Sequence, residues 1–200
     1  MQKFKLFLRF DREEKWLEHM AKQGWMLFGK SLFYDFRPVT PGEKTIRIDY
    51  REFKSAKDFS DYCALFEDSG WQHIAGTKSS GAQYFLKIKA DSTEDIFSDV
   101  LSRAGRYKRL SGAWFSTAVL FMPFLTVSKI NAGTLFAPRE WYLTPGLWEL
   151  EGFSFWRAFL FETPFALMRG VSWLMPVFAL LLCIGFAVKA SLLYRSETKG

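Results

Sequence analysis

The sequence predicts an α+β fold: a tandem βαββ repeat that forms an antiparallel sheet with two helices on one face, followed by a two-helix transmembrane hairpin. The stretches between Arg109 and Lys129 and between Arg169 and Lys189 contain no charged residue. Each stretch, as a helix, is long enough to cross the hydrocarbon core of a bilayer. In addition, a strand–helix–Gly–Trp pattern occurs twice in the polar first part of the chain. The expected organisation is a cytoplasmic domain at 1–90, a helical connector at 91–109, transmembrane helices at 110–128 and 170–189, an extracytoplasmic segment at 129–169 and a cytoplasmic tail at 190–200.

The first repeat begins with alternating apolar and polar residues at 3–10, which is the period of a strand. A helix is expected next, with Asp11 as its N-cap and Trp16 and Leu17 in its apolar stripe. Gly24 ends this helix, because glycine adopts the left-handed conformation that a helix C-terminus requires, and Trp25 follows. Two more strands complete the unit, at 25–28 and 32–39.

The second repeat has the same order of elements. A strand at 44–53 precedes a helix at 56–69, and the pair Gly70-Trp71 repeats Gly24-Trp25. With the glycines aligned, Trp16 corresponds to Tyr62 and Leu17 to Cys63. Two further strands are expected at 71–76 and 82–88. The Gly-Trp pairs are interpreted as helix ends whose tryptophans pack across the seam between helix and sheet, rather than as ligand-stacking groups.

Basic residues at 103–109 lie directly before the first apolar stretch, and positive residues beside a span stay on the cytoplasmic side. Both termini are therefore expected inside the cell, in a multi-pass arrangement. The segment 129–169 is crowded with Trp, Tyr and Phe. Such residues favour the membrane interface, so this segment is expected to lie on or partly in the membrane, the alternative being an aromatic patch that binds a partner.

One group of residues is a candidate ligand site. In the strand at 44–53, alternate residues would point away from the helices, and the other strands carry charged and aromatic residues at similar positions. Two interpretations stay open: a solvated face with cross-strand ion pairs, or a groove for an anionic or aromatic ligand or a protein partner. The candidate residues are Arg47, Asp49, Arg51, Phe33, Asp35, Phe7, Arg9 and Phe85.

Motifs of enzyme active sites do not occur in the sequence, which has no Gly-rich phosphate loop, zinc-type pair or serine elbow. No catalytic residue, metal site or cofactor is therefore expected. The net charge of +6 is moderate and does not require a nucleic-acid partner. The two cysteines, Cys63 and Cys183, are expected to be unpaired and inert. Because neither apolar stretch carries Asp, Glu, Lys or Arg, an ion pathway through them is not expected.

The motif Glu14-Lys-Trp-Leu, together with both Gly-Trp pairs, Tyr34-Asp-Phe36 and Arg47-Ile-Asp-Tyr50, resembles the bacterial domain-of-unknown-function family 2812. The resemblance covers about the first 107 residues. It implies a domain that precedes spans in the bacterial cytoplasmic membrane and that often occurs beside PadR-type transcriptional repressors. The family has no assigned activity, so no functional residue carries over. Tandem βαββ units also resemble the effector-binding domains of gyrase-inhibitor-like proteins, which hold small ligands between repeats.

The sequence thus favours a non-enzymatic regulatory or sensory membrane protein whose cytoplasmic domain binds a small-molecule ligand or a protein partner. The alternative is an accessory subunit of a membrane transport or envelope-stress system that acts through its membrane hairpin. Membrane lipid is an expected partner in both cases, and a homo-oligomer stays open.

Overall fold

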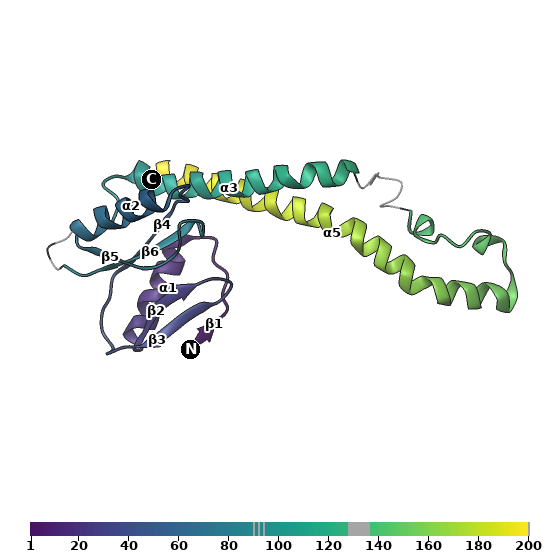
Figure 1. Ribbon diagram of the computed structural model, residues 1–200, viewed down its shortest axis with the longest axis horizontal. Helices are drawn as coiled ribbons and strands as arrows, with labels where there is room; N and C mark the ends of the chain where they lie inside the picture. The colour runs from purple at the N-terminus through teal and green to yellow at the C-terminus, as the bar shows by residue number, and fades with distance from the viewer. Residues whose placement is uncertain (90, 92, 94, 128–136, 200) are drawn as a thin grey trace. The chain divides into compact units, whose positions relative to one another are not determined.

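The computed structural model describes residues 1–89, 91, 93, 95–127 and 137–199 (Figure 1). The chain has a mixed α+β architecture with two three-stranded antiparallel sheets and two long helices. It divides into two compact units. Unit 1 comprises Met1–Ser111 and Lys189–Gly200, and unit 2 comprises Gly112–Val188.

The first half of unit 1 contains β1 (Gln2–Lys3), α1 (Phe10–Lys22), β2 (Trp25–Lys30) and β3 (Tyr34–Pro38). Its sheet has the strand order β1–β3–β2. The predicted strand at 3–10 is wrong beyond Lys3, because only Gln2 and Lys3 pair with β3. Phe10 instead begins α1 and packs on the ring of Tyr107, with a centroid distance of 5.0 Å.

The second half contains β4 (Ile46–Tyr50), α2 (Ala56–Asp68), β5 (Trp71–Ala75) and β6 (Ala82–Lys87). Its sheet has the order β4–β6–β5, which is the order of the first sheet. Ser55 caps α2, because its hydroxyl oxygen accepts a hydrogen bond from the Lys57 amide at 3.1 Å. The predicted positions of α2, β5 and β6 are confirmed to within about two residues.

The glycines that follow α1 and α2 have nearly the same backbone conformation, with φ of 84° at Gly24 and 85° at Gly70. The Gly24 amide donates to the Ala21 carbonyl and the Gly70 amide to the Glu67 carbonyl, each at 3.0 Å. A residue with a Cβ is strained in this conformation. Both glycines therefore end their helices in the predicted way.

The expectation of one sheet with both helices on one face is wrong. Tyr84 and Phe85 are neighbours on β6, so their side chains point to opposite faces of the sheet. Tyr84 donates a hydrogen bond to Glu13 on α1, whereas Phe85 packs against Phe66 on α2. Helix α1 thus lies between the two sheets, and α2 covers the far face of the second sheet.

Side chains of α1 occupy the outer edge of β4, whereas the contact between the two sheets is made by β2 and β5. The carboxylate of Glu14 accepts from the Ile48 amide at 3.0 Å, and the carboxylate of Glu18 accepts from the Ile46 amide at 3.2 Å. These glutamates lie one turn apart on α1, which matches the two-residue spacing of the outward amides on a strand edge. A further strand has no donors left to pair with at these positions.

Helix α3 (Val100–Val127) begins later than the predicted connector helix. The Asp99 carboxylate caps it by accepting from the Ser102 amide at 2.8 Å. Ile96 packs beside the second core cluster, which contains Trp71 and Phe85, and does not continue a helix. The predicted cap at 91–95 is therefore wrong where the structure describes it, and residues 92 and 94 lie outside the described residues.

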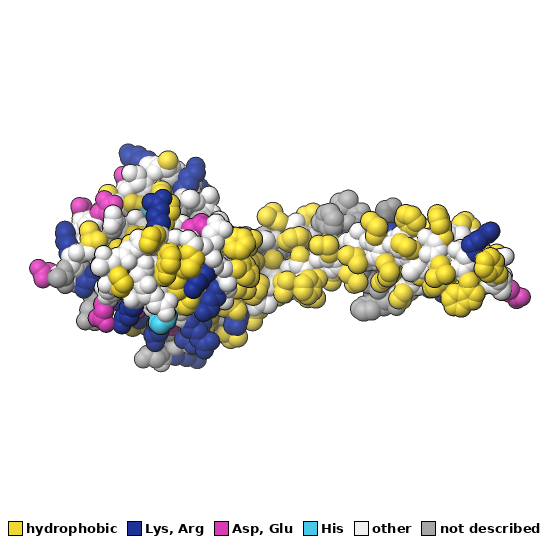
Figure 2. All heavy atoms as spheres, turned by 90° about the horizontal axis from the view of Figure 1, so that it is seen from below, with side chains coloured by type: hydrophobic (Ala, Val, Ile, Leu, Met, Phe, Trp, Pro, Cys, Tyr) yellow, Lys and Arg dark blue, Asp and Glu magenta, His cyan; other side chains and the backbone are white. Residues whose placement is uncertain are grey.

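Helix α5 (Gly152–Lys199) contains the predicted transmembrane helix at 170–189 and extends well beyond it at both ends. It is the one helix, among the described residues, that is long and apolar enough to cross a membrane. Near its end, in the predicted tail at 190–200, Leu193 and Tyr194 pack on the core of unit 1. Figure 2 shows that hydrophobic side chains cover most of the elongated part of the chain, where few charges are visible.

The described part of the predicted segment 129–169 folds onto α5 within unit 2. Two short 3-10 helices, η1 (Pro138–Trp141) and η2 (Leu147–Glu149), precede α5. The carboxylate of Glu162 accepts from the amides of Leu143 and Thr144 at 2.6 and 2.9 Å. Residues 129–136 lie outside the described residues.

Candidate functional site

Arg106 on α3 is fully buried and fixes the start of this helix to unit 1. Its guanidinium donates to Glu14 and Asp11, each at 2.6 Å, and to the Ile48 carbonyl at 3.0 Å. A buried charge is tolerated only where it is paired and hydrogen-bonded. Burial alone would raise the pKa of Asp11, but the hydrogen bond from Arg103 and the charge of Arg106 hold it below its ordinary value.

One turn further along α3, Arg109 joins the helix to the end of β4. Its guanidinium donates to the Asp49 carboxylate and to the Tyr50 carbonyl. Asp49 is itself buried and accepts a second hydrogen bond from the Tyr62 hydroxyl on α2 at 2.8 Å. Burial and the Asp49 charge raise the pKa of Tyr62 above its ordinary value. Asp49 therefore connects β4, α2 and α3 at one point.

Two hollows open beside this junction. The first has a volume of about 260 Å³ and is lined by Asp49, Arg51, Tyr62, Leu65, Phe66, Phe97, Ser102 and Arg109. The second has a volume of about 290 Å³ and is lined by Leu65, Phe66, Ser69, Trp71, Thr93, Asp95, Ile96, Phe97 and Ser98. Because both are bordered by Leu65, Phe66 and Phe97, they form neighbouring parts of one surface, which we call the α2 cleft.

The α2 cleft contains a buried hydrogen-bond donor without an acceptor. Trp71 is completely buried, and its indole N–H makes no hydrogen bond to any described residue. Such a donor costs free energy, about 1–3 kcal/mol, unless a bound group accepts from it. The rest of the wall combines aromatic rings with the cations of Arg51 and Arg109 and the carboxylates of Asp49 and Asp95. The Arg51 guanidinium lies 5.5 Å from the centre of the Tyr62 ring. The cleft thus fits an apolar or aromatic body with a hydrogen-bond acceptor.

The structure places only some of the predicted ligand residues at this cleft. Asp49 and Arg51 line it. Arg47 lies beside it and donates to Glu18 at 2.8 Å. Phe85 is fully buried beneath α2 and is not part of a polar face. Of the two interpretations left open, the solvated face does not describe the surroundings of Phe85, because α2 covers this residue.

The other four predicted residues lie in the first half of unit 1 and do not join this group. Phe7 packs on Trp16, and Arg9 lies 3.7 Å from the Asp11 carboxylate. Phe33 is partly exposed against Phe4, and Asp35 accepts from Gln2 at 2.8 Å. Of these four, Asp35 alone lies in a strand, β3, and none of them lines the α2 cleft, so they form no common site with Asp49.

Several residues of the cleft were missed from the sequence. Tyr62 was assigned to the apolar stripe of its helix, and Arg109 to the basic cluster beside the membrane span. A signal was present in the chain: Arg106 and Arg109 lie on one face of α3, at a spacing of three residues. Their partners could not be found without knowing which strand faces this helix.

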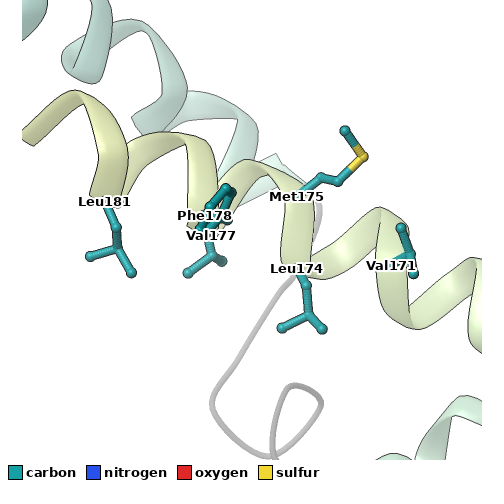
Figure 3. A pocket seen from close by; sticks show the side chains of 6 residues that line it. All are labelled: Val171, Leu174, Met175, Val177, Phe178 and Leu181. Carbon is teal, nitrogen blue, oxygen red and sulfur yellow. The ribbon is translucent and has the colours of Figure 1, made fainter.

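A further hollow, of about 450 Å³, lies on α5 and is lined by Val171, Leu174, Met175, Val177, Phe178 and Leu181 (Figure 3). All of these side chains are apolar and come from one helix. The close-up shows them projecting from neighbouring turns rather than enclosing a cavity. The hollow is therefore a gap between exposed side chains and offers no polar group to orient a ligand. Among the described residues, no group of three or more His, Cys, Asp or Glu side chains is placed to hold a metal ion.

The fold and the cleft define a mixed α+β domain that is fixed to the start of a long helix by the buried Arg106 and the half-buried Arg109, in a chain that also carries a long apolar helix. The model of one family, described as "Protein of unknown function (DUF2812)", matches residues 9–119, which is more than half of the 200-residue chain. The chain belongs to this family. Searches of curated proteins and of solved structures returned no match.

Proposed function

We propose that this protein is a non-enzymatic regulatory protein of the bacterial cytoplasmic membrane, and that unit 1 binds a small amphipathic ligand in the α2 cleft. The observation that carries the proposal is the buried indole N–H of Trp71, which lacks an acceptor at the wall of the cleft. The equal strand order of the two sheets and the matching conformations of Gly24 and Gly70 support a duplicated βαββ scaffold beneath it.

The membrane part of the proposal is a hairpin of α3 and α5 with both termini in the cytoplasm. The uncharged run of α5 satisfies the length of a span, and α3 continues beyond Arg109 without a charged residue. Within unit 2, Trp114 on α3 and Phe186 on α5 are in ring contact at 4.9 Å, which supports a hairpin of antiparallel helices. The basic residues at 103–109 favour the cytoplasmic side for this end, because positive residues beside a span stay inside.

Labelling in intact cells tests this orientation. Ser31 is exposed in unit 1, so a cysteine there reports the side on which the domain lies. In a Cys63→Ser background, Ser31→Cys should stay unreactive toward a membrane-impermeant maleimide until the cells are opened. Reaction in intact cells would reverse the topology.

Ligand binding is proposed to act through α3, because the cleft contains groups from both the sheet and this helix. A ligand that accepts from Trp71 and fills the space beside Phe97 also lies next to Arg109 and Ser102. An acidic group on the ligand would be attracted to Arg51 and would compete with Asp49 for Arg109. The ligand thereby favours one arrangement of α3 over another, which is the condition for passing a signal into the membrane helices.

The test is a thermal-shift screen of small aromatic and carboxylate-containing metabolites on the full chain in detergent micelles. The isolated segment 1–90 is unsuitable, because Tyr107, Leu110, Leu193 and Tyr194 complete the core of unit 1. A ligand at a hundred times its Kd stabilises the native state by about 2.7 kcal/mol, which raises the melting temperature by several degrees, roughly 5–11 °C for a chain of this size.

Trp71→Phe removes the indole N–H and keeps an aromatic ring, so it should abolish the shift. Trp25→Phe is the matched control, because Trp25 begins the corresponding strand of the first sheet and lines no part of the cleft. A library without any stabilising compound, or an equal response of the two variants, would remove the ligand-binding proposal.

The second candidate function is an accessory subunit that binds a membrane partner through unit 2. Phe153, Trp156 and Phe161 are all exposed at the start of α5, although neighbouring aromatic residues pack together. Replacing these three residues by serine should release a copurifying membrane partner if this candidate is correct, and should leave the ligand response of unit 1 unchanged.

A further inference from the structure

The segment between β1 and α1 exposes apolar side chains that a soluble surface does not need. Phe4 is 63% exposed and Leu6 is 71% exposed, and Lys5 and Arg9 lie between and beside them. Their alternation resembles a strand, but the segment pairs with no strand beyond Lys3. Figure 2 shows hydrophobic and basic side chains next to one another on the face of unit 1 that it presents. Contiguous apolar residues at a surface mark an interaction site.

A hollow of about 480 Å³ lies along this segment and is lined by Leu6, Phe7, Leu8, Arg9, Arg12 and Lys189. Three of these six residues are cations, and no carboxylate lines the hollow. Arg9 has an ion pair of 3.7 Å with Asp11 at a partly exposed position. For Arg12 and Lys189, no carboxylate of a described residue lies within ion-pair distance. The hollow therefore attracts an anion and has an apolar wall beside it.

Lys189 relates the position of this hollow to the proposed membrane span. It is the first charged residue after the uncharged run from Gly170 to Val188 in α5. If that run crosses the bilayer, as proposed above, Lys189 lies at the level of the lipid headgroups. Because Leu6, Arg9 and Arg12 border the same hollow, the segment 4–12 lies at that level too.

We propose that this hollow binds the phosphate of an anionic phospholipid of the surrounding bilayer. The cations of Arg9, Arg12 and Lys189 contact the phosphate oxygens, and Leu6 and Phe4 enter the boundary between headgroups and acyl chains. A phosphodiester offers acceptor oxygens of the kind that guanidinium groups bind well. This inference rests on the membrane span of the proposed function and is independent of the α2 cleft.

The experiment compares the full chain in micelles that contain phosphatidylglycerol with the same chain in micelles that contain phosphatidylcholine. The melting temperature and the amount of phosphatidylglycerol retained after purification are measured. Phosphatidylglycerol should stabilise the wild type more than phosphatidylcholine does. Inorganic phosphate at the same concentration should have little effect, because it has no acyl chains to contact Leu6.

The triple variant Arg9→Gln, Arg12→Gln and Lys189→Gln should lose this preference, with a weakening of about fivefold for each cation removed. The matched control is Lys44→Gln, Lys54→Gln and Lys57→Gln, which removes the same charge at exposed positions outside the hollow. Leu6→Asp is a second test that keeps all three cations: it places a carboxylate in the hollow at an exposed position, and it should also abolish the preference.

Equal losses in the two triple variants would show attraction by net charge alone and would overturn the proposal. Stabilisation by inorganic phosphate equal to that by the lipid would identify a free-anion site instead and would overturn it as well. Extraction of the wild type from native membranes by alkaline carbonate distinguishes a failure of the proposed membrane span from a failure of the proposed lipid site. Release by carbonate contradicts the span and this inference together, whereas retention without a phosphatidylglycerol effect contradicts this inference alone.

Discussion

The two halves of unit 1 share a strand order but use their helices differently. Helix α1 lies between both sheets and buries Phe10, Glu13, Glu14, Leu17, Met20 and Ala21. Helix α2 covers one face of one sheet and buries only Tyr62. The internal packing of the two halves is nevertheless alike, since Trp16 contacts Phe36 in the first half and Tyr62 contacts Phe85 in the second.

This difference explains why the cleft lies in the second half. The faces of α1 that pack on the two sheets leave no room for a cleft between them, whereas α2 has one side without a covering layer and borders the two hollows. The tryptophans that follow the helices show the same contrast. Trp25 is partly exposed and reaches water, while Trp71 is completely buried and leaves its N–H without an acceptor. The same local pattern therefore gives a helix that is packed on both sides in one half and a helix with one open side in the other.

The largest expected effect comes from breaking the contact between α1 and α3. Arg106→Ala leaves the buried carboxylate of Glu14 without its cation, which should lower the free energy of unfolding by about 3–5 kcal/mol. Arg103→Ala is the control, because Arg103 also binds Asp11 but is partly exposed, and it should cost less than about 1 kcal/mol. Thermal unfolding of the full chain in micelles measures both. Similar melting temperatures for the two variants would contradict a central role of Arg106.

The second prediction compares corresponding positions of the two helices. Leu17 is almost fully buried between the sheets, so Leu17→Ala should cost about 2–5 kcal/mol through the cavity that it leaves. Cys63, at the corresponding position of α2, is half-buried, so Cys63→Ala should cost less than about 1 kcal/mol. The same unfolding measurement applies. A cost at Cys63 as large as that at Leu17 would show that α2 is as tightly packed as α1.

Local signals in the sequence predicted the elements of both halves better than their assembly. Gly24 and Gly70 are recognisable because a helix end with positive φ favours glycine wherever it occurs. The alternation of apolar and polar residues at 3–10 led to a wrong strand prediction. Such an alternation shows that successive side chains have different environments, but it does not show whether a neighbouring strand is available for pairing. The pairing of Glu14 with Arg106 was not predictable, because it joins residues 92 positions apart. For the candidate site, Asp49 and Arg51 were found from their strand, whereas Tyr62, Trp71 and Arg109 depended on which layer covers that strand.

The two glycines give a smaller effect that tests the duplication directly. Gly24→Ala and Gly70→Ala should each cost about 1–2 kcal/mol, because both positions have left-handed backbone. At Gly24 the added Cβ would in addition lie 3.1 Å from the Val39 carbonyl oxygen, so this neighbour would have to shift. Stabilities equal to that of the wild type at both positions would contradict equivalent helix ends.

The smallest expected effect is a pH dependence that differs between two carboxylates of α1. Glu13 accepts hydrogen bonds from Tyr34 of the first sheet and Tyr84 of the second, each at 2.7 Å. Its burial nevertheless raises its pKa above the ordinary value of 4.5. Asp11 has the opposite shift, because the pairing with Arg103 and Arg106 outweighs its burial and lowers its pKa below 3.8.

The signs follow from proton linkage, since stability falls with rising pH wherever the folded state binds more protons than the unfolded state. The contribution of Glu13 is fully present below pH 4.5 and is lost as the pH rises through its folded pKa. The contribution of Asp11 is present above pH 3.8 and is lost on acidification through its folded pKa. Relative to wild type, Glu13→Gln should therefore gain stability as the pH rises from 4 to 7, whereas Asp11→Asn should lose stability between pH 3 and 5. Chemical denaturation of the full chain across this pH range measures the stability of both variants relative to the wild type. If this relative stability changed with pH in the same direction for both variants, the opposite pKa shifts of Glu13 and Asp11 would be contradicted.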